Sequence, residues 1–170
     1  FADIGESLAA HLGIAPGASF DYRFRPPDAG TFWYHADAAG QADRGLAGPL
    51  IVEEAQLVDV DRDIALVLTS AADGPPVLVN GSVRPDLAVQ GGERVRLRII
   101  NATHTRGLFL TFAAHAVRVM AIDGQPAEPF LARDSRVVLG PGNRIDLFVD
   151  MAAAGAATPS EASADAVSFS

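Results

Sequence analysis

Residues 27–52 read PDAGTFWYHADAAGQADRGLAGPLIV, and this stretch decides the fold of the chain. A proline, an aspartate and a glycine predict a turn that ends at Gly30, and the aromatic and β-branched run after it predicts a strand that ends at His35. Side chains alternate along a strand, so His35 and Asp37 lie on one face if the extended conformation continues through Ala36. The stretch therefore places two possible ligands side by side.

The sequence on both sides of this stretch is typical of strands. Upstream, FDYRFR at residues 20–25 alternates apolar with polar side chains, and downstream Pro49–Glu54 predicts another short strand. Further strands are expected where apolar or alternating runs lie between Gly, Pro, Asn and Asp turns: Asp61–Thr69, Val77–Asn80, Leu87–Val89, Glu93–Asn101, Leu108–Phe112, Val117–Ile122, Ser135–Leu139 and Arg144–Val149. Many short strands with hardly any helix predict an all-β fold, a Greek-key β-sandwich.

Composition narrows the classes of function. The 170 residues leave room for one full domain and part of another. The formal charge of −8 argues against nucleic-acid binding through phosphate neutralisation, and no apolar run is long enough to span a bilayer. Because the chain has no cysteine, disulfides, zinc–thiolate sites and a copper–thiolate centre are excluded on these residues.

The stretch around His35 resembles the second copper-binding motif of the multicopper oxidases. In that family the motif runs Gly-Thr-x-Trp-Tyr-His-x-His, then Gln, Gly-Leu-x-Gly and a Pro-Leu-Ile-Val strand, and residues 30–35, Gln41, residues 45–48 and residues 49–52 match it in order and spacing. The resemblance implies copper as cofactor and His35 as a ligand of the type 3 copper pair. Asp37 stands where the family has its second histidine. The implied chemistry is one-electron oxidation of a phenolic or metal-ion donor coupled to reduction of dioxygen, in the periplasm or outside the cell.

The second half of the sequence also resembles this family, specifically its second cupredoxin domain, which binds no copper and acts as a spacer. The matching runs include Asn80-Gly, Ile122-Asp-Gly-Gln-Pro and Gly140-Pro-Gly-x-Arg-Ile-Asp-Leu. We therefore expect four parts: an unassigned N-terminal segment (1–13), the C-terminal half of a first cupredoxin domain (14–54), a near-complete second domain (55–150) and a flexible linker or tail (151–170).

The half-domain has consequences for partners. About three strands without a facing sheet leave an apolar surface and open sheet edges. We therefore expect missing cupredoxin modules from the same protein or another chain, or packing of these strands onto the domain that follows, and we expect self-association. The sequence opens at Phe1 without a charged and apolar leader, which leads us to expect a mature or internal segment.

Other interpretations of the candidate residues stay open. His35 is either a copper ligand or a strand-end histidine bonded to a carboxylate such as that of Asp37, and one imidazole beside a carboxylate is a poor copper site. The chain is accordingly part of an oxidase, with the isolated chain inactive, or a non-catalytic cupredoxin scaffold that has lost its copper sites. Glu53 and Glu54 are expected at a solvated strand end, and Asp59, Asp61 and Asp63 on one wet face at the start of a strand. The glycosylation sequon Asn101-Ala-Thr103 is expected to be accidental.

Overall fold

The computed structural model describes residues 14–36, 45–71, 74–83, 87, 89–112, 115–151 and 166–169. Within these ranges the chain is built almost wholly of strands, with one short 3₁₀ turn, η2 (Arg133–Ser135). The strands are β1 (Gly30–His35), β2 (Ala47–Val52), β3 (Arg62–Ala71), β4 (Gly74–Val79), β5 (Arg94–Asn101), β6 (Leu108–Phe112), β7 (Ala116–Ile122), β8 (Gln125–Leu131), β9 (Arg136–Leu139), β10 (Arg144–Asp150) and β11 (Ala166–Phe169). The all-β prediction is confirmed, and none of the described helical turns is long enough to cross a membrane.

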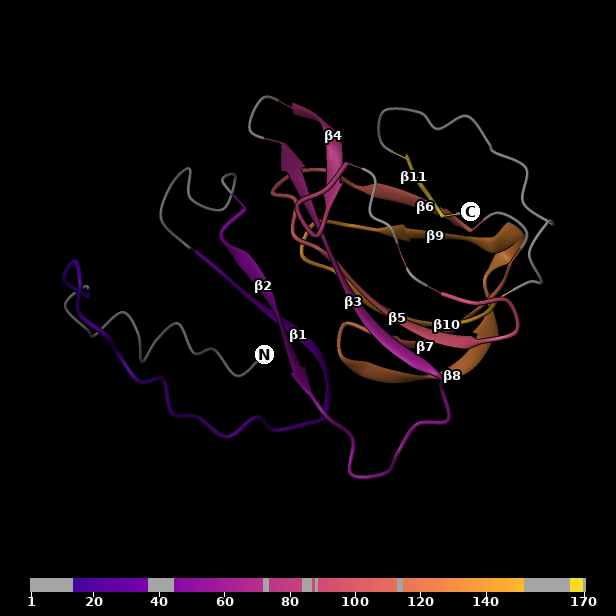
Figure 1. The fold of residues 1–170 in the computed structure, drawn as a ribbon, viewed down its shortest axis with the longest axis horizontal. Helices are drawn as coiled ribbons and strands as arrows, with labels where there is room; N and C mark the ends of the chain where they lie inside the picture. Colours follow the sequence, from indigo (N-terminus) through magenta and orange to yellow (C-terminus); the bar gives the residue numbers. More distant parts are fainter. Residues whose placement is uncertain are drawn as a thin grey trace.

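The strands form three sheets, which Figure 1 shows around one central sheet. The central sheet has six strands in the order β4-β3-β5-β10-β7-β8, and a three-stranded sheet, β11-β6-β9, faces it. Most neighbours are antiparallel, but β3 lies parallel to β5 and β11 lies parallel to β6. The third sheet is the β1-β2 hairpin, in which Gly30 pairs with Val52 and His35 pairs with Ala47.

The main core lies between the six-stranded and three-stranded sheets. The alternation predicted for β5 is confirmed, because Val95, Leu97 and Ile99 are all buried there. Buried side chains of β3, β7 and β10 extend the same face, and those of β6 and β9 pack against it: Leu66, Leu68, Val117, Val119, Ile145, Leu147, Val149, Leu108, Leu110, Phe112, Val137 and Leu139. Full burial of each aliphatic side chain contributes about 1.5–3 kcal/mol, so this core is the main source of the sandwich's stability.

The turns follow from residues that tolerate positive φ. Asn80 and Gly81 have φ of 49° and 79°, and Asp123 and Gly124 have φ of 52° and 79°. Two successive positive φ values are the signature of a type I′ turn, whose twist matches that of the paired strands it joins. Gly124 has a second role, because its backbone lies against the β1-β2 hairpin.

The predicted strand at residues 20–25 is wrong in the structure. Residues 14–25 are all exposed, and none of the described strands pairs with them. An alternating pattern predicts which side chains share a face, but a strand also needs a neighbouring backbone to bond with.

Three other differences have local causes. Residues 166–169 form β11 beside β6, so the predicted flexible tail is wrong for this segment, whose Ala-Val-Ser-Phe sequence suits a strand. The strand β8 was not predicted, because Pro126 and Pro129 argue against a strand in the middle of a sheet. β8 lies at the edge of the sheet, where proline is tolerated. At Leu87 and Val89, a hydrogen bond from Val89 N to Leu87 O bends the backbone where a strand was expected.

The β1-β2 hairpin packs on the outer face of the six-stranded sheet. A Cβ atom added at Gly30 would lie 2.7 Å from the carbonyl oxygen of Gly124, so the two backbones meet with no room for a side chain. Trp33 and Ala47 pack against Val67, Ile100 and Ala102 of the sheet's outer surface. The hairpin and the sandwich therefore form one packed unit at this face.

Gly30→Ala is expected to lower the free energy of unfolding by about 2 kcal/mol or more, because its φ of 145° suits only glycine and its Cβ would strike Gly124. Urea unfolding measures the change. The matched control is Gly107→Ala, where an added Cβ meets nothing within 4 Å. Equal effects of the two substitutions would contradict the close contact.

Candidate functional site

His35 is the last residue of β1, the strand that carries the predicted ligand. Burial falls along this strand: Gly30 and Thr31 are buried, Phe32 and Trp33 are partly buried, and Tyr34 and His35 are exposed. The imidazole of His35 stacks on the ring of Trp33, with ring centroids 4.5 Å apart and an interplanar angle of 29°. Since Trp33 packs on the sandwich, the stack holds an exposed imidazole at a fixed place on the surface.

A second contact of His35 determines which ring nitrogen is available to bind a metal ion. Nδ1 lies 3.2 Å from the carbonyl oxygen of Ala36. A carbonyl oxygen only accepts hydrogen bonds, so this contact requires the proton on Nδ1. In that tautomer Nε2 carries a free lone pair, which is the form in which histidine ligates a metal ion.

The described residues do not make a copper centre around this imidazole. Across the described ranges, no group of three or more His, Cys, Asp or Glu side chains is placed to hold a metal ion. Asp37 and Gln41 lie outside the described residues, so the expected pairing of His35 with Asp37 stays a prediction. A single imidazole falls short of the three or four protein ligands that such sites use.

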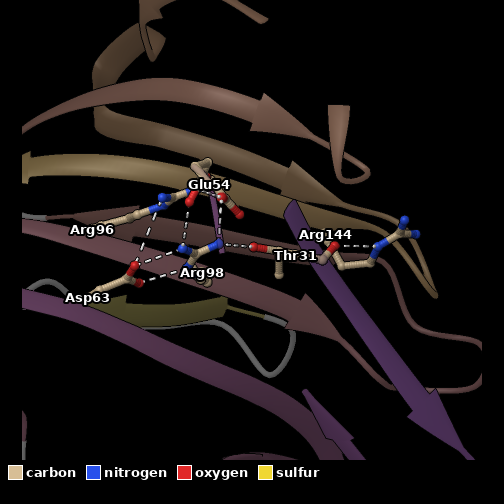
Figure 2. Close-up of polar contacts among 7 residues, drawn as sticks. Thr31, Glu54, Asp63, Arg96, Arg98 and Arg144 are labelled. Carbon is tan, nitrogen blue, oxygen red and sulfur yellow. Dashed lines mark hydrogen bonds and ion pairs between the residues drawn. The ribbon is translucent and has the colours of Figure 1, made fainter. Parts of the chain in front are cut away.

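The main polar cluster of the structure lies on the outer face of the six-stranded sheet, and Figure 2 shows most of it. Arg96 and Arg98 project from β5 on the side away from the core and are only 5% and 3% exposed. Arg96 Nη2 donates to Glu54 Oε1 and to Asp146 Oδ2, each at 2.6 Å. Arg98 donates from Nε and Nη2 to the two carboxylate oxygens of Asp63, at 2.7 and 2.8 Å.

This cluster reaches β1 through Thr31, which is 1% exposed. Arg98 Nη1 donates to the hydroxyl oxygen of Thr31 at 3.1 Å, and Arg144 Nε donates to its carbonyl oxygen at 3.4 Å. Arg144 is itself fixed by Asp123, whose carbonyl oxygen accepts from Nη2 at 2.9 Å. Figure 2 shows Thr31 between Arg98 and Arg144, so charged side chains of the six-stranded sheet hold the strand that ends at His35.

The cluster corrects two expectations about solvated acids. Glu54 and Asp63 were expected on wet surfaces, but both bind buried guanidinium groups. The hydrogen bond from Arg96 is the main reason that the pKa of Glu54 falls to about 2, against the opposing effect of its partial burial. The sequence signal was the run of alternating arginines in β5, which the strand pattern alone could not assign to a buried face.

Two further polar residues, Asn101 and His104, lie at the end of β5 and in the loop after it. The Asn101 side chain is fully buried and donates to the carbonyl oxygens of Arg106, Leu139 and Gly140, so the sequon at this position serves the fold. His104 is exposed in the loop after β5. Neither residue lies in a metal-binding group among the described residues.

Comparisons with known proteins agree with the resemblance. Two family models, each described as multicopper oxidase, match residues 3–57 and residues 33–157. Laccase-3 of Trametes villosa is 33% identical over 148 residues, which are 74% of this chain and 31% of the laccase. The iron transport multicopper oxidase fetC of Epichloe festucae is 30% identical over 145 residues, which are 71% of this chain and 23% of that protein.

The solved structures give the same result. The multi-copper oxidase from Pseudomonas parafulva superposes with a TM-score of 0.76 at 30% identity, covering 85% of this chain and 41% of that one. The chain thus spans between about a quarter and two fifths of the length of these relatives.

Glu54→Gln is expected to destabilise the fold at neutral pH by about 1 kcal/mol, a value reduced for the partial exposure of the carboxylate. Because the folded pKa of Glu54 is lowered from 4.5 to about 2, its contribution is complete above pH 4.5 and is lost as the pH falls toward 2. Urea unfolding at several pH values should therefore show the two proteins converging in acid. Glu53→Gln, at the exposed neighbouring position, is the control. A difference between Glu54→Gln and the parent that does not depend on pH would contradict the ion pair.

Proposed function

Because the chain belongs to the multicopper oxidase family, we propose that it supplies a copper-ligand strand and a copper-free spacer domain to a laccase-like oxidase. Copper is the cofactor of this family, and it carries single electrons from the donor to dioxygen when bound. The proposed donor class is a phenol or a reduced metal ion. A laccase and an iron transport oxidase among the relatives support these two donor classes.

The observation that carries the proposal is the position of His35. The residue matches the family's histidine in a motif that extends to Val52, and its imidazole is exposed at the end of an anchored strand. With the proton on Nδ1, Nε2 faces no partner that competes for its lone pair among the described hydrogen bonds. We propose His35 as a type 3 copper ligand, with Asp37 at the place of the second histidine.

The remaining ligands have to come from outside the described residues. One imidazole does not complete a copper centre, and the 170 residues contain no cysteine for a copper–thiolate site. We propose that further cupredoxin modules, in the same protein or in another chain, complete the site, and that the isolated chain does not reduce dioxygen. From the family resemblance, we propose that the whole oxidase works in the periplasm or outside the cell.

A second candidate function is a cupredoxin scaffold that no longer uses copper. The observation in its favour is Asp37, because a carboxylate is a harder ligand than the imidazole that the family has at this position. In that case His35 is an ordinary surface histidine stacked on Trp33. The two functions differ in whether His35 binds Cu²⁺.

Trp33 provides the measurement, since it is the only tryptophan of the chain and its ring stacks on His35. If Cu²⁺ binds His35, titration with copper sulfate is expected to quench the tryptophan fluorescence strongly, and His35→Ala is expected to remove the quenching. His104→Ala, at an exposed histidine elsewhere, should leave it unchanged. Asp37→His is expected to shift the titration to lower copper concentration, because it restores a second imidazole.

The outcomes separate the two functions. Quenching that persists in His35→Ala, or a titration that Asp37→His does not move, would favour the scaffold. Steady oxygen uptake by the isolated chain with a phenolic donor would contradict the proposal that the chain needs further modules.

A further inference from the structure

The turn that follows β4 holds the only Asn-Gly sequence of the chain, Asn80-Gly81. Asn101 and Asn143 are followed by alanine and arginine instead. An asparagine before glycine is the sequence most prone to deamidation, because glycine has no side chain to hinder attack by its backbone nitrogen. Asn80 and Gly81 are both exposed, so water reaches this turn. The turn therefore offers the atoms and the access that this reaction needs.

Deamidation has two steps and uses no reagent other than water. The backbone nitrogen of Gly81 gives up its proton and attacks Cγ of Asn80. The new N–Cγ bond forms, the Cγ–Nδ2 bond breaks and ammonia leaves, which closes a succinimide ring. Water then opens the ring at either carbonyl group and leaves aspartate or isoaspartate. The sum is one amide and one water converted to one carboxylic acid and one ammonia, with no change in oxidation state.

Two hydrogen bonds to β3 hold the side-chain amide of Asn80 against this attack. Oδ1 accepts from the backbone N–H of Val67 at 2.8 Å, and Nδ2 donates to the carbonyl oxygen of Ala65 at 3.0 Å. The backbone N–H of Asn80 also donates to the carbonyl oxygen of Val67, at 2.9 Å. Attack at Cγ turns a planar amide into a tetrahedral carbon, so Oδ1 and Nδ2 cannot both keep their partners. The reaction therefore has to break these bonds before it can proceed.

The two bonds also complete the pairing of β3. Figure 1 shows β4 beside β3, and β4 is the edge strand of the six-stranded sheet. The register of β4 on β3 ends where Val79 faces Leu68, and the chain turns directly after Val79. Ala65 and Val67 lie beyond that point on the same edge of β3. The amide of Asn80 bonds them as a further residue of β4 would, so a side chain extends the ladder of hydrogen bonds.

The products of deamidation cannot replace this amide. An ionised carboxylate only accepts hydrogen bonds, so aspartate can still bond the N–H of Val67 but has no proton for the carbonyl oxygen of Ala65. It also places a negative charge against that oxygen. Isoaspartate adds a carbon atom to the backbone and so lengthens a turn of two residues. Either product weakens the edge of the sheet at β3 and β4.

We propose that Asn80 is a latent deamidation site, which stays intact while its amide is bonded to β3 and reacts when this edge of the sheet opens. Because neither product restores the bond to Ala65, each conversion leaves the edge weaker and cannot be reversed by refolding. The site needs no metal ion and no partner chain, so it stands apart from the proposed function of His35.

Peptide mass spectrometry measures the protection. The whole chain is incubated in mildly alkaline buffer, folded in one sample and unfolded by urea in the other, and the peptide that contains Asn80 is followed over time. Two hydrogen bonds have to break in the folded chain, so its deamidation rate at Asn80 is expected to be at least about tenfold lower than that of the unfolded chain. Equal rates would overturn the proposal.

A second turn separates the effect of the two bonds from the effect of the turn itself. Asp123-Gly124 has nearly the same φ values, 52° and 79°, and Asp123→Asn creates another Asn-Gly pair there. The carboxylate of Asp123 accepts from Asn143 Nδ2 at 3.0 Å and from Arg144 N at 2.8 Å, so an amide NH₂ in this place faces a donor. The introduced amide is expected to react faster than Asn80 in the same folded chain. Equally slow reaction at both turns would show that the turn conformation protects, which overturns the proposal.

Asn80→Asp tests the effect of the product on the fold. This variant is expected to unfold at a lower urea concentration than the parent chain, because the bond to Ala65 is lost. Asn80→Gly, which keeps the positive φ and removes both side-chain bonds, is the reference, and its Val67 amide is expected to exchange hydrogen about tenfold faster than in the parent. An Asn80→Asp chain as stable as the parent, or a Val67 amide that exchanges equally in Asn80→Gly and the parent, would overturn the proposed weakening.

Discussion

The structure depends on two guanidinium groups that are buried on the outer face of the central sheet. Arg96 and Arg98 carry two positive charges, and Glu54, Asp63 and Asp146 surround them with three negative ones. Removing a charge from water is costly unless it is paired and fully hydrogen-bonded, and removing one partner of such a group leaves an uncompensated buried charge. The three acids come from the segment after β2, from β3 and from β10, so the cluster holds separate parts of the chain in one arrangement.

Arginine is needed here for geometric reasons. Arg98 bonds both oxygens of Asp63, the hydroxyl of Thr31 and one oxygen of Glu54 from a single planar group. A lysine ammonium is a point charge with three donors and cannot present this fork. The same side chain therefore has its charge balanced by Asp63 and Glu54 and still has a donor left for Thr31 of the hairpin. The contact between the six-stranded sheet and the hairpin follows from how the arginine is neutralised.

The sequence predicted much of this architecture and little of its outer face. Alternation in β5 identified Val95, Leu97 and Ile99 as core, because only one side of a strand meets the opposite sheet. The same alternation of apolar and polar residues arises whether the polar side meets water or a layer of acids. The acids that bond these arginines lie 35 to 50 residues away in the sequence. His35 was found because a motif with fixed spacing surrounds it. For residues 20–25 the sequence failed in a different way: the alternating pattern predicts a strand but does not say which strand would pair with it.

Burial falls along β1 from Thr31, which contacts the arginine cluster, to the exposed His35, the proposed copper ligand. On the face toward the sandwich, Thr31 is held by Arg98 and Trp33 packs on Ile100, and these two sheet residues are themselves two apart on β5. The hydrogen bond of Thr31 and the apolar contact of Trp33 are thus two residues apart on both strands, and together they fix the register of the hairpin on the sheet. A slip by one residue would point both side chains away from the sheet. The next residue on that face is His35, which the sheet no longer covers. Its ring is exposed but stacks on Trp33. A histidine held in this way has a defined position and an open side, which is the condition a metal site needs when its other ligands lie elsewhere.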